Sequence, residues 1–373
     1  MSLFQQTPVV IYPRQNTFLQ PLTQAEDAAL LEIGDEPVIF RTLQQLAIMG
    51  LRQIVVAVTQ EQHALHGFLR NVRIPGLSIQ IHHIDKNNPI RQILHNHASD
   101  QFFIINSDIL LKDSLFDFYK SHQQQNAEVT IGVKHLQTDT RFTDATVLQN
   151  HVTMRRLHTF SPPWLHYDCG IYLLDKKFLD RMPKLSNEES LEKTIVKYAM
   201  ETQHARLEDI NYLCADLRNV DDFMHENFNW IQNQYRIAQN NYLYSGNKNE
   251  PLRIGEVYIH PDAKVSSKSV LIGPLVIGRN CVIDEHVFLQ RSVIRRNVHI
   301  EKGVVVKDSL VDKNAVLRKG LRYFERLVMD DSRNYDMHHF QKTSTIIRDY
   351  SHQAQSQWEE QGDQTRKKLN ILV

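Results

Sequence analysis

The sequence predicts an α/β domain with a mostly parallel sheet, followed by a left-handed parallel β-helix built from hexapeptide repeats. Short apolar runs alternate with helical patterns over the first 245 residues, and an aliphatic residue then recurs at every sixth position. The chain has 373 residues, which is long for one domain and sufficient for two. We therefore predict an α/β domain over residues 1–245, the β-helix over residues 252–320 and a polar tail over residues 321–373.

The first part of the chain is typical of repeated β–α–β units. The strands that its apolar runs predict are residues 9–11, 53–58, 79–84, 102–106, 128–133, 170–174 and 212–215. Helical spacing of apolar residues occurs at residues 37–46 and again at residues 221–240. Strands that alternate with helices of about 10–15 residues form β–α–β units and pair in parallel. Residues 102–105 are apolar without a break, so we expect this strand to be buried on both faces of the sheet.

After a linker at residues 245–251, the period of the sequence changes to six. The repeating aliphatic residues, with one position dropped at two points, are Ile259, Val265, Leu271, Ile277, Ile283, Leu289, Ile294, Ile300, Val306, Val311 and Leu317. Three six-residue segments complete one triangular coil, so each aliphatic side chain points inward and stacks on its counterpart one coil away. A β-sandwich would instead show alternation with a turn about every 8–12 residues.

The composition indicates which binding partners and which cellular compartment to expect. Lys and Arg number 43 and balance 43 Asp and Glu, so we expect no basic surface that would attract nucleic acid. No apolar run reaches the ~18 residues of a membrane-spanning helix, and the first residues lack the pattern of a signal peptide. Three cysteines are too few for a disulfide framework, so a reducing cytoplasm is the expected location.

Five segments of the chain form an ordered series of motifs. They are Phe-Leu-Gln-Pro-Leu-Thr at residues 18–23, Ala-Leu-Leu-Glu-Ile-Gly-Asp-Glu-Pro-Val-Ile at 29–39, Ile-Asn-Ser-Asp at 105–108, Cys-Gly-Ile-Tyr at 169–172 and Asp-Leu-Arg-Asn-Val-Asp-Asp-Phe at 216–223. Their order and spacing resemble the sugar-phosphate nucleotidylyltransferases, the NDP-sugar synthases such as GDP-mannose pyrophosphorylase, over roughly residues 7–320. The resemblance implies a Rossmann-like nucleotidyltransferase domain. It also implies a reaction in which a sugar 1-phosphate attacks the α-phosphate of a nucleoside triphosphate and pyrophosphate leaves.

Two aspartates match the carboxylates that hold the metal in this family. By the resemblance, Asp108 and Asp216 would bind Mg²⁺, which prefers hard oxygen ligands. Asp108 directly follows a predicted buried strand, at the sheet edge where α/β folds bind ligands. A single aspartate at a strand end is also a common turn or helix cap, and that alternative stays open.

The segment that would bind phosphate departs from the family pattern. The glycine-rich loop of the family is replaced by Tyr-Pro-Arg-Gln-Asn-Thr-Phe at residues 12–18, and the chain has only 13 glycines in all. Glu26 and Asp27 lie where the family has a lysine, which would place carboxylates near the phosphate site. The residues assigned to nucleotide or sugar-phosphate binding are Arg14, Thr17, Arg91, Gly170 and Arg218. The alternative for the three arginines is that they lie on the solvated surface and bind no anion.

Scaffold positions of the family are thus retained while phosphate-binding positions are lost. This contrast predicts a non-catalytic protein that binds a nucleotide sugar, or a regulatory or assembly subunit in carbohydrate metabolism. The alternatives are a divergent but active NDP-sugar synthase, and an acyltransferase working through the β-helix with His260, His286 or His299. By resemblance, the β-helix also predicts a homo-oligomer or a complex with a related subunit.

Overall fold

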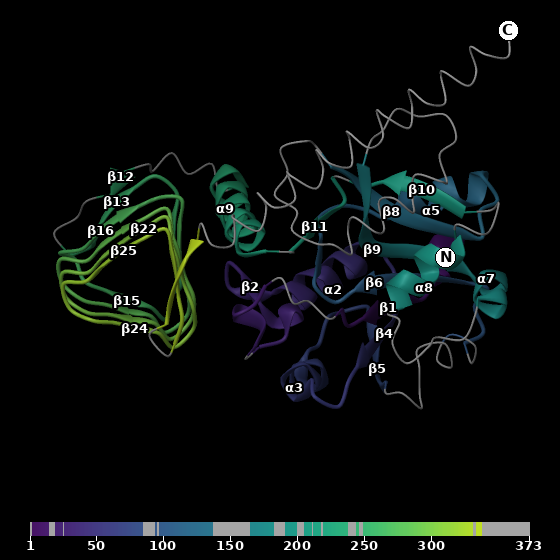
Figure 1. Ribbon diagram of the computed structural model, residues 1–373, viewed down its shortest axis with the longest axis horizontal. Coiled ribbons are helices and arrows are strands. Elements are labelled where there is room, and N and C mark those ends of the chain that lie inside the picture. The colour runs from purple at the N-terminus through teal and green to yellow at the C-terminus, as the bar shows by residue number, and fades with distance from the viewer. Residues whose placement is uncertain are drawn as a thin grey trace, which may run out of the picture.

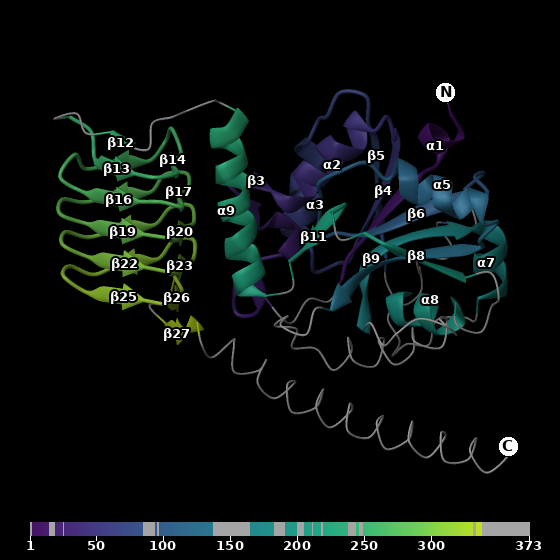
Figure 2. The ribbon, with the colours of Figure 1, turned by 90° about the horizontal axis from the view of Figure 1, so that it is seen from above.

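An α/β domain and a β-helix lie side by side in the protein, with helix α9 (Val220–Ile237) between them (Figures 1 and 2). This architecture confirms the predicted fold class. The computed structural model describes residues 2–14, 19–24, 26–84, 94, 97–136, 165–182, 191–199, 205–210, 212–217, 219–237, 244–245, 249–330 and 333–337.

Among the described residues, the sheet of the α/β domain has seven strands in the order β10-β8-β9-β6-β1-β4-β5. Their bounds are β1 (Val9–Tyr12), β4 (Gln53–Val58), β5 (Ser78–His83), β6 (Gln101–Asn106), β8 (Val129–Leu136), β9 (Leu165–Asp175) and β10 (Ala205–Asp209). All neighbours are parallel except the pairs that β9 makes with β6 and β8. A separate antiparallel pair joins β7 (Ile109–Leu111) to β11 (Cys214–Asp216). Every strand predicted in this part overlaps an observed one.

Helices cover both faces of this sheet. One face packs on α1 (Leu3–Gln6), α2 (Val38–Ile48), α3 (His63–Asn71) and α5 (Phe116–Gln124), and the other on α7 (Lys176–Arg181) and α8 (Leu191–Ala199). The helix α2 shows the reason, because its buried residues recur every three or four positions and form one apolar stripe. None of the described helices combines the length and apolar character needed to cross a membrane.

The β-helix consists of three parallel ladders within the described residues. The first contains β13 (Leu252–Ile254), β16 (Val270–Ile272), β19 (Phe288–Gln290), β22 (Val305–Lys307) and β25 (Arg322–Phe324). The second contains β14 (Val257–Ile259), β17 (Leu275–Ile277), β20 (Val293–Ile294), β23 (Leu310–Val311) and β26 (Arg326–Val328). The third contains β15 (Lys264–Val265), β18 (Val282–Ile283), β21 (His299–Ile300) and β24 (Val316–Leu317).

The predicted stack of aliphatic residues is confirmed as the core of the β-helix. Leu271 pairs with Leu289 one coil further on, and Leu289 pairs with Val306. All eleven predicted positions belong to one hydrophobic cluster, and of these eleven only Ile259 and Val265 are partly exposed. The two dropped positions of the repeat correspond to shorter coils. Paired residues of the first coil are 18 positions apart, as in Leu252 and Val270, whereas those of the later coils are 17 apart, as in Val305 and Arg322.

Asparagines form the turns at one corner of these coils. Asn280, Asn297 and Asn314 all have positive φ, a conformation that asparagine tolerates better than most residues. Their side-chain amides also form a hydrogen-bonded ladder from coil to coil.

Antiparallel strands close two of the ladder ends. The strand β12 (Tyr244–Ser245) pairs with β13, and β27 (Asn334–Asp336) pairs with β26. The ladders therefore continue past residue 320, where the sequence predicts the polar tail to start. The division into domains itself stays a prediction, and residues 338–373 of the predicted tail lie outside the described residues.

Candidate functional site

The carboxyl ends of β1 and β6 bring two of the predicted site residues together. These strands are parallel neighbours, with Tyr12 opposite Asn106, and the Ser107 amide donates to the Tyr12 carbonyl at 2.9 Å. Arg14 and Asp108 each lie two residues beyond this pair and leave the sheet at the same edge. Ligands of α/β folds bind at this edge, as the sequence predicts for Asp108.

The side chain of Arg14 turns inward and forms an ion pair with Asp108. Its Nη1 lies 3.7 Å from Asp108 Oδ2, and the two side chains are 15% and 1% exposed. The Asn106 amide is assigned with its oxygen toward the guanidinium, because only this orientation pairs donors with acceptors. That oxygen then accepts from Arg14 Nη2 at 2.7 Å and from Nε at 2.6 Å. The arginine is therefore part of the site's interior.

Gly170 provides the space that this guanidinium fills. Its φ is +74°, and a Cβ added there would lie 2.3 Å from Arg14 Nη2 and 2.4 Å from the side-chain amide of Asn106. A side chain at this position is thus excluded both by the backbone conformation and by contact with the arginine. Of the residues assigned to ligand binding, Arg14 and Gly170 therefore lie close together. Arg14 pairs with Asp108, and Gly170 lies against Arg14 and Asn106.

Further acidic and phenolic groups, which the sequence analysis did not assign, belong to the same region of the sheet edge, where the charge of Arg14 acts on Tyr172. Tyr172 donates its hydroxyl proton to Asp168, and the Gly170 amide donates to Asp168 Oδ1 at 2.7 Å. Burial, with Asp168 and Glu192 adding to it, raises the pKa of Tyr172 well above 10. Asp168 lies two residues before the Gly-Ile-Tyr motif, and this proximity was the only signal that pointed to it.

Tyr12 completes this group at the end of β1. Burial and the charge of Glu192 raise its pKa to about 12. Asp108 thus pairs with Arg14, while the charges of Asp168 and Glu192 act on the two tyrosines beside it.

The second predicted metal ligand is placed by its backbone. Asp216 pairs with Ile109 in the ladder of β11 and β7, one residue along from Asp108, while its side chain lies outside what the structure describes. A magnesium ion requires several oxygen ligands at about 2.0–2.1 Å in octahedral geometry. Asp108 is instead neutralised by Arg14, and no group of three or more metal-binding side chains occurs among the described residues. Asp108, the predicted ligand whose side chain is described, is thus paired with a guanidinium rather than open to a magnesium ion.

Three of the predicted binding residues lie outside the described residues, namely Thr17, Arg91 and Arg218. Their convergence with Arg14 on one anion site stays a prediction.

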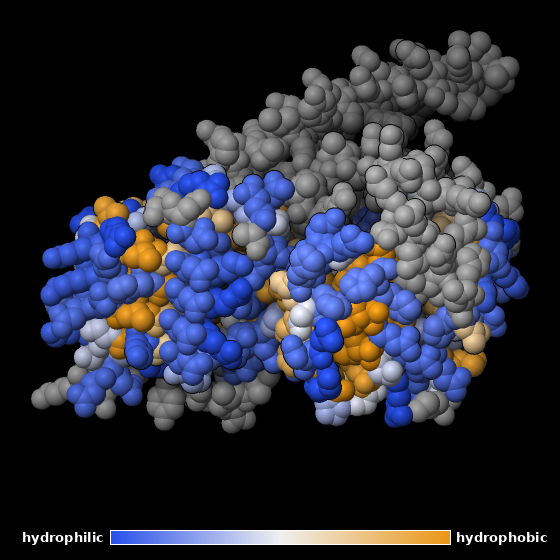
Figure 3. Space-filling view, turned by 90° about the horizontal axis from the view of Figure 1, so that it is seen from below, coloured by the Kyte–Doolittle hydropathy of each residue, from blue (hydrophilic) through white to orange (hydrophobic). Residues whose placement is uncertain are grey.

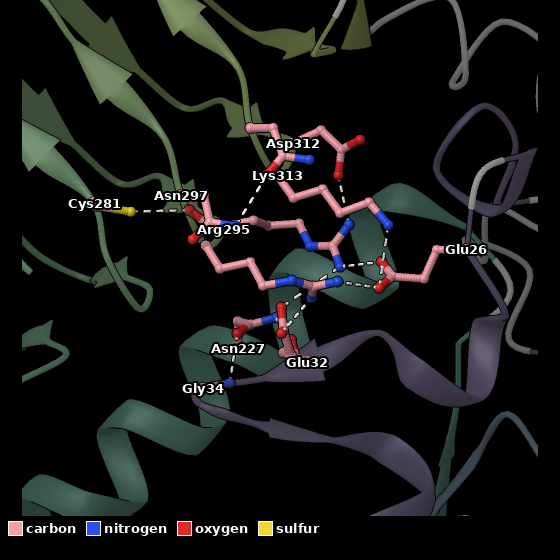
Figure 4. A network of polar contacts seen from close by, with 11 residues as sticks. Glu26, Glu32, Gly34, Asn227, Cys281, Arg295, Asn297, Asp312 and Lys313 are labelled. Atoms are coloured by element: carbon pink, nitrogen blue, oxygen red, sulfur yellow. Dashed lines mark hydrogen bonds and ion pairs between the residues drawn. The ribbon is translucent and has the colours of Figure 1, made fainter. Parts of the chain in front are cut away.

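Glu26 differs from the expectation that it lies near a phosphate site. It points instead toward the β-helix and forms the centre of an ion network between the domains (Figure 4). Arg295 Nη2 lies 2.5 Å from Glu26 Oε2, Arg295 Nη1 lies 2.5 Å from Asp312 Oδ1, and Lys313 lies 3.3 Å from Glu26. Arg296 pairs with the same glutamate from the next position. Sequence reasoning missed this role because the partners are about 270 residues apart.

Electrostatics favour the ionised form of Glu26 in this network. Burial alone would raise its pKa, but the charges and hydrogen bonds of Arg295 and Arg296 outweigh burial and lower the pKa to about 2. The side chains of Glu26, Arg295 and Asp312 are at most 5% exposed, so this network is shielded from water.

A cleft of about 340 Å³ also lies between the domains, beside this network. Its lining includes Asp35, Phe40, Phe68 and Arg296 but neither Arg14 nor Asp108. The candidate site at the sheet edge is therefore separate from this cleft.

Comparison with known proteins extends over both domains. A family model described as Nucleotidyl transferase matches residues 15–228, and one described as GMPPB C-terminal domain matches residues 253–347. The chain is 23% identical to "Probable mannose-1-phosphate guanylyltransferase 3" of Oryza sativa subsp. japonica, with 74% of this chain and 77% of that protein covered. It is 23% identical to "Mannose-1-phosphate guanylyltransferase" of Mycobacterium tuberculosis, with 76% and 78% covered.

A third relative is named as a subunit. The chain is 24% identical to "Mannose-1-phosphate guanylyltransferase catalytic subunit beta" of Drosophila melanogaster, with 67% and 68% covered. The nucleotidyl transferase model alone spans more than half of the chain, and a sheet of the predicted type with the β-helix after it agrees with the two matched regions. The chain therefore belongs to the nucleotidyl transferase family, among the sugar-phosphate nucleotidylyltransferases.

Proposed function

We propose that this protein acts in sugar-nucleotide metabolism by binding a nucleotide or nucleotide sugar without transferring it. Nucleotidyl transfer depends on backbone N–H groups, cationic side chains and a metal that together neutralise the phosphates. The segment at residues 12–18 has no glycine to bring the backbone close to a phosphate. Loss of one such donor typically costs about 10²–10³ in rate, so loss of several leaves little activity.

One observation carries the proposal, namely the position of the Arg14 guanidinium against Asp108, Asn106 and Gly170. Arg14, which the structure describes at this site, is engaged with a carboxylate of the protein. It also lies against the carboxylate that would hold the metal in an active relative. Both features oppose catalysis of nucleotidyl transfer.

A divergent active enzyme is the second candidate, and one observation favours it. Pairing of β11 with β7 keeps Asp216 one residue along from Asp108 in register, so both carboxylate positions of the family remain neighbours. In that case the two aspartates would act together on a metal when a substrate displaces Arg14.

Measurement of pyrophosphate release separates the two candidates. Because the relatives are named mannose-1-phosphate guanylyltransferases, the assay contains mannose 1-phosphate, GTP and Mg²⁺. We expect no release above background, together with saturable binding of GTP or GDP-mannose in isothermal titration. Release that Asp108→Asn abolishes would refute the proposal and establish the enzyme. Absence of both binding and release would refute the ligand-binding role.

We further propose that the chain assembles with a second copy or a related subunit in a reducing cytoplasm. A relative carries the name of a catalytic subunit, and all three cysteines of this chain are buried and form no disulfide. Figure 3, viewed from the side on which β15 and β24 lie in Figure 1, presents hydrophobic side chains between two hydrophilic columns of the β-helix. Val282 and Val316 of this ladder are exposed. Mass photometry would contradict assembly if only a 43.6 kDa monomer persisted at micromolar concentration.

A further inference from the structure

Arg14 is held from more than one side at the edge of the sheet. The Asn106 amide oxygen accepts two hydrogen bonds from its guanidinium, at 2.6 and 2.7 Å. The Cα of Gly170 closes another side, where even a methyl group would overlap Nη2. A guanidinium with both hydrogen bonds and a close backbone contact has one defined position, and here that position is beside Asp108.

Asp108 needs a cation, because its side chain is only 1% exposed. An ionised carboxylate removed from water is costly unless a positive charge or hydrogen-bond donors accompany it. In a metal-dependent relative a divalent ion supplies that charge. In this chain Arg14 brings a positive charge to 3.7 Å from Oδ2 of Asp108.

A divalent ion and this guanidinium exclude each other at Asp108. An ion coordinated at about 2.0–2.1 Å by Asp108 would lie within a few ångströms of Nη1, in a site shielded from water. Repulsion between the two cations is strong at that separation and is little reduced by salt in a buried site. The hydrogen bonds to Asn106 oppose movement of the arginine away from the site.

We propose that Arg14 is a built-in replacement for the divalent cation, and that the candidate site consequently does not bind Mg²⁺ or Mn²⁺. The inference rests on the proposed function, since it explains how the site became independent of metal. It adds that the carboxylate of Asp108, which would hold the metal, is retained but is covered by Arg14. Removal of Arg14 should therefore restore affinity for a divalent ion.

Binding of Mn²⁺ alone tests the proposal, with electron paramagnetic resonance of free Mn²⁺ as the readout. We expect no specific Mn²⁺ site in the wild type, and at least a tenfold gain in Mn²⁺ affinity in Arg14→Ala. The double variant Arg14→Ala/Asp108→Asn should lose that gain. Arg14→Lys is the matched control, because it keeps the positive charge and should remain without a Mn²⁺ site.

Two results would overturn the proposal. The first is a Mn²⁺ site in the wild type that Asp108→Asn removes, which can be measured even if Arg14→Ala does not fold. The second is an Arg14→Ala protein with the circular dichroism spectrum of the wild type and no gain in Mn²⁺ affinity. Neither result depends on turnover, whereas pyrophosphate release alone decides the proposed absence of catalysis. The two proposals can therefore fail separately.

Discussion

Replacing Glu26 by glutamine removes the carboxylate at the centre of the ion network between the domains (Figure 4). We expect the variant to be less stable than the wild type by about 3 kcal/mol at pH 7. The magnitude follows from the pKa of Glu26, which falls from 4.5 to about 2 against the guanidiniums of Arg295 and Arg296. A lowering by about 2.5, at about 1.4 kcal/mol for each pKa unit, gives this value. Removal of one partner from a buried ion pair costs a similar amount, about 3–5 kcal/mol.

The same pKa fixes the sign of the pH dependence. Because the folded-state pKa of Glu26 lies below the unfolded value, its stabilising contribution is fully present above about pH 4.5 and is lost as the pH falls toward 2. The difference in stability between the wild type and Glu26→Gln should therefore shrink below pH 4.5, to about 1 kcal/mol near pH 3.

Urea unfolding, followed by circular dichroism at several pH values between 7 and 3, measures this difference. Glu285→Gln is the matched control, since hydrogen bonds from Lys268 and Lys302 also lower the pKa of Glu285 to about 2. The side chain of Glu285 is 43% exposed on the β-helix, against 5% for Glu26, so water screens its charges and the change in stability should be much smaller. Equal losses in the two variants, or no loss in Glu26→Gln, would refute the reasoning from burial.

Three further substitutions test other parts of the structure. Gly34→Ala should destabilise the protein by roughly 1–3 kcal/mol and alter tryptophan fluorescence, because φ is +70° and the new Cβ would lie 2.6 Å from the Trp230 ring. Tyr172→Phe removes a hydrogen bond to the buried Asp168 and should cost about 1–3 kcal/mol in chemical unfolding, whereas an unchanged midpoint would contradict that bond. Leu289→Ala, at a fully buried position of the β-helix stack, should cost about 2–5 kcal/mol by the same measurement, and a loss below 1 kcal/mol would indicate a loosely packed stack.

Elements with local periodicity could be predicted closely. The strand at residues 53–58 has the predicted bounds, and the continuous apolar run after residue 101 is a central strand buried on both faces. The β-helix could be predicted equally well, because each coil repeats the same inward-pointing positions after a short stretch of sequence. Such patterns depend on which faces of a strand are buried, and they can be read from consecutive residues of the chain.

The candidate site could be predicted only in part. The position of Asp108 at the carboxyl edge of the sheet followed from the apolar run before it, and the strand β6 ends two residues before this aspartate. The partners of Arg14 did not follow, because its direction depends on the space left by Gly170 and on the amide of Asn106. Nothing in the sequence around Arg14 distinguishes an inward guanidinium from one in solvent.

The sequence by itself thus determined the fold class and the family. Only the tertiary structure decided which charges meet. It pairs Arg14 with Asp108, and it turns Glu26 away from the predicted phosphate site toward Arg295 of the other domain. The physical reason is that apolar periodicity is a local property of the chain. The partner of a buried charge is chosen by packing between segments that lie about 90 to 270 residues apart.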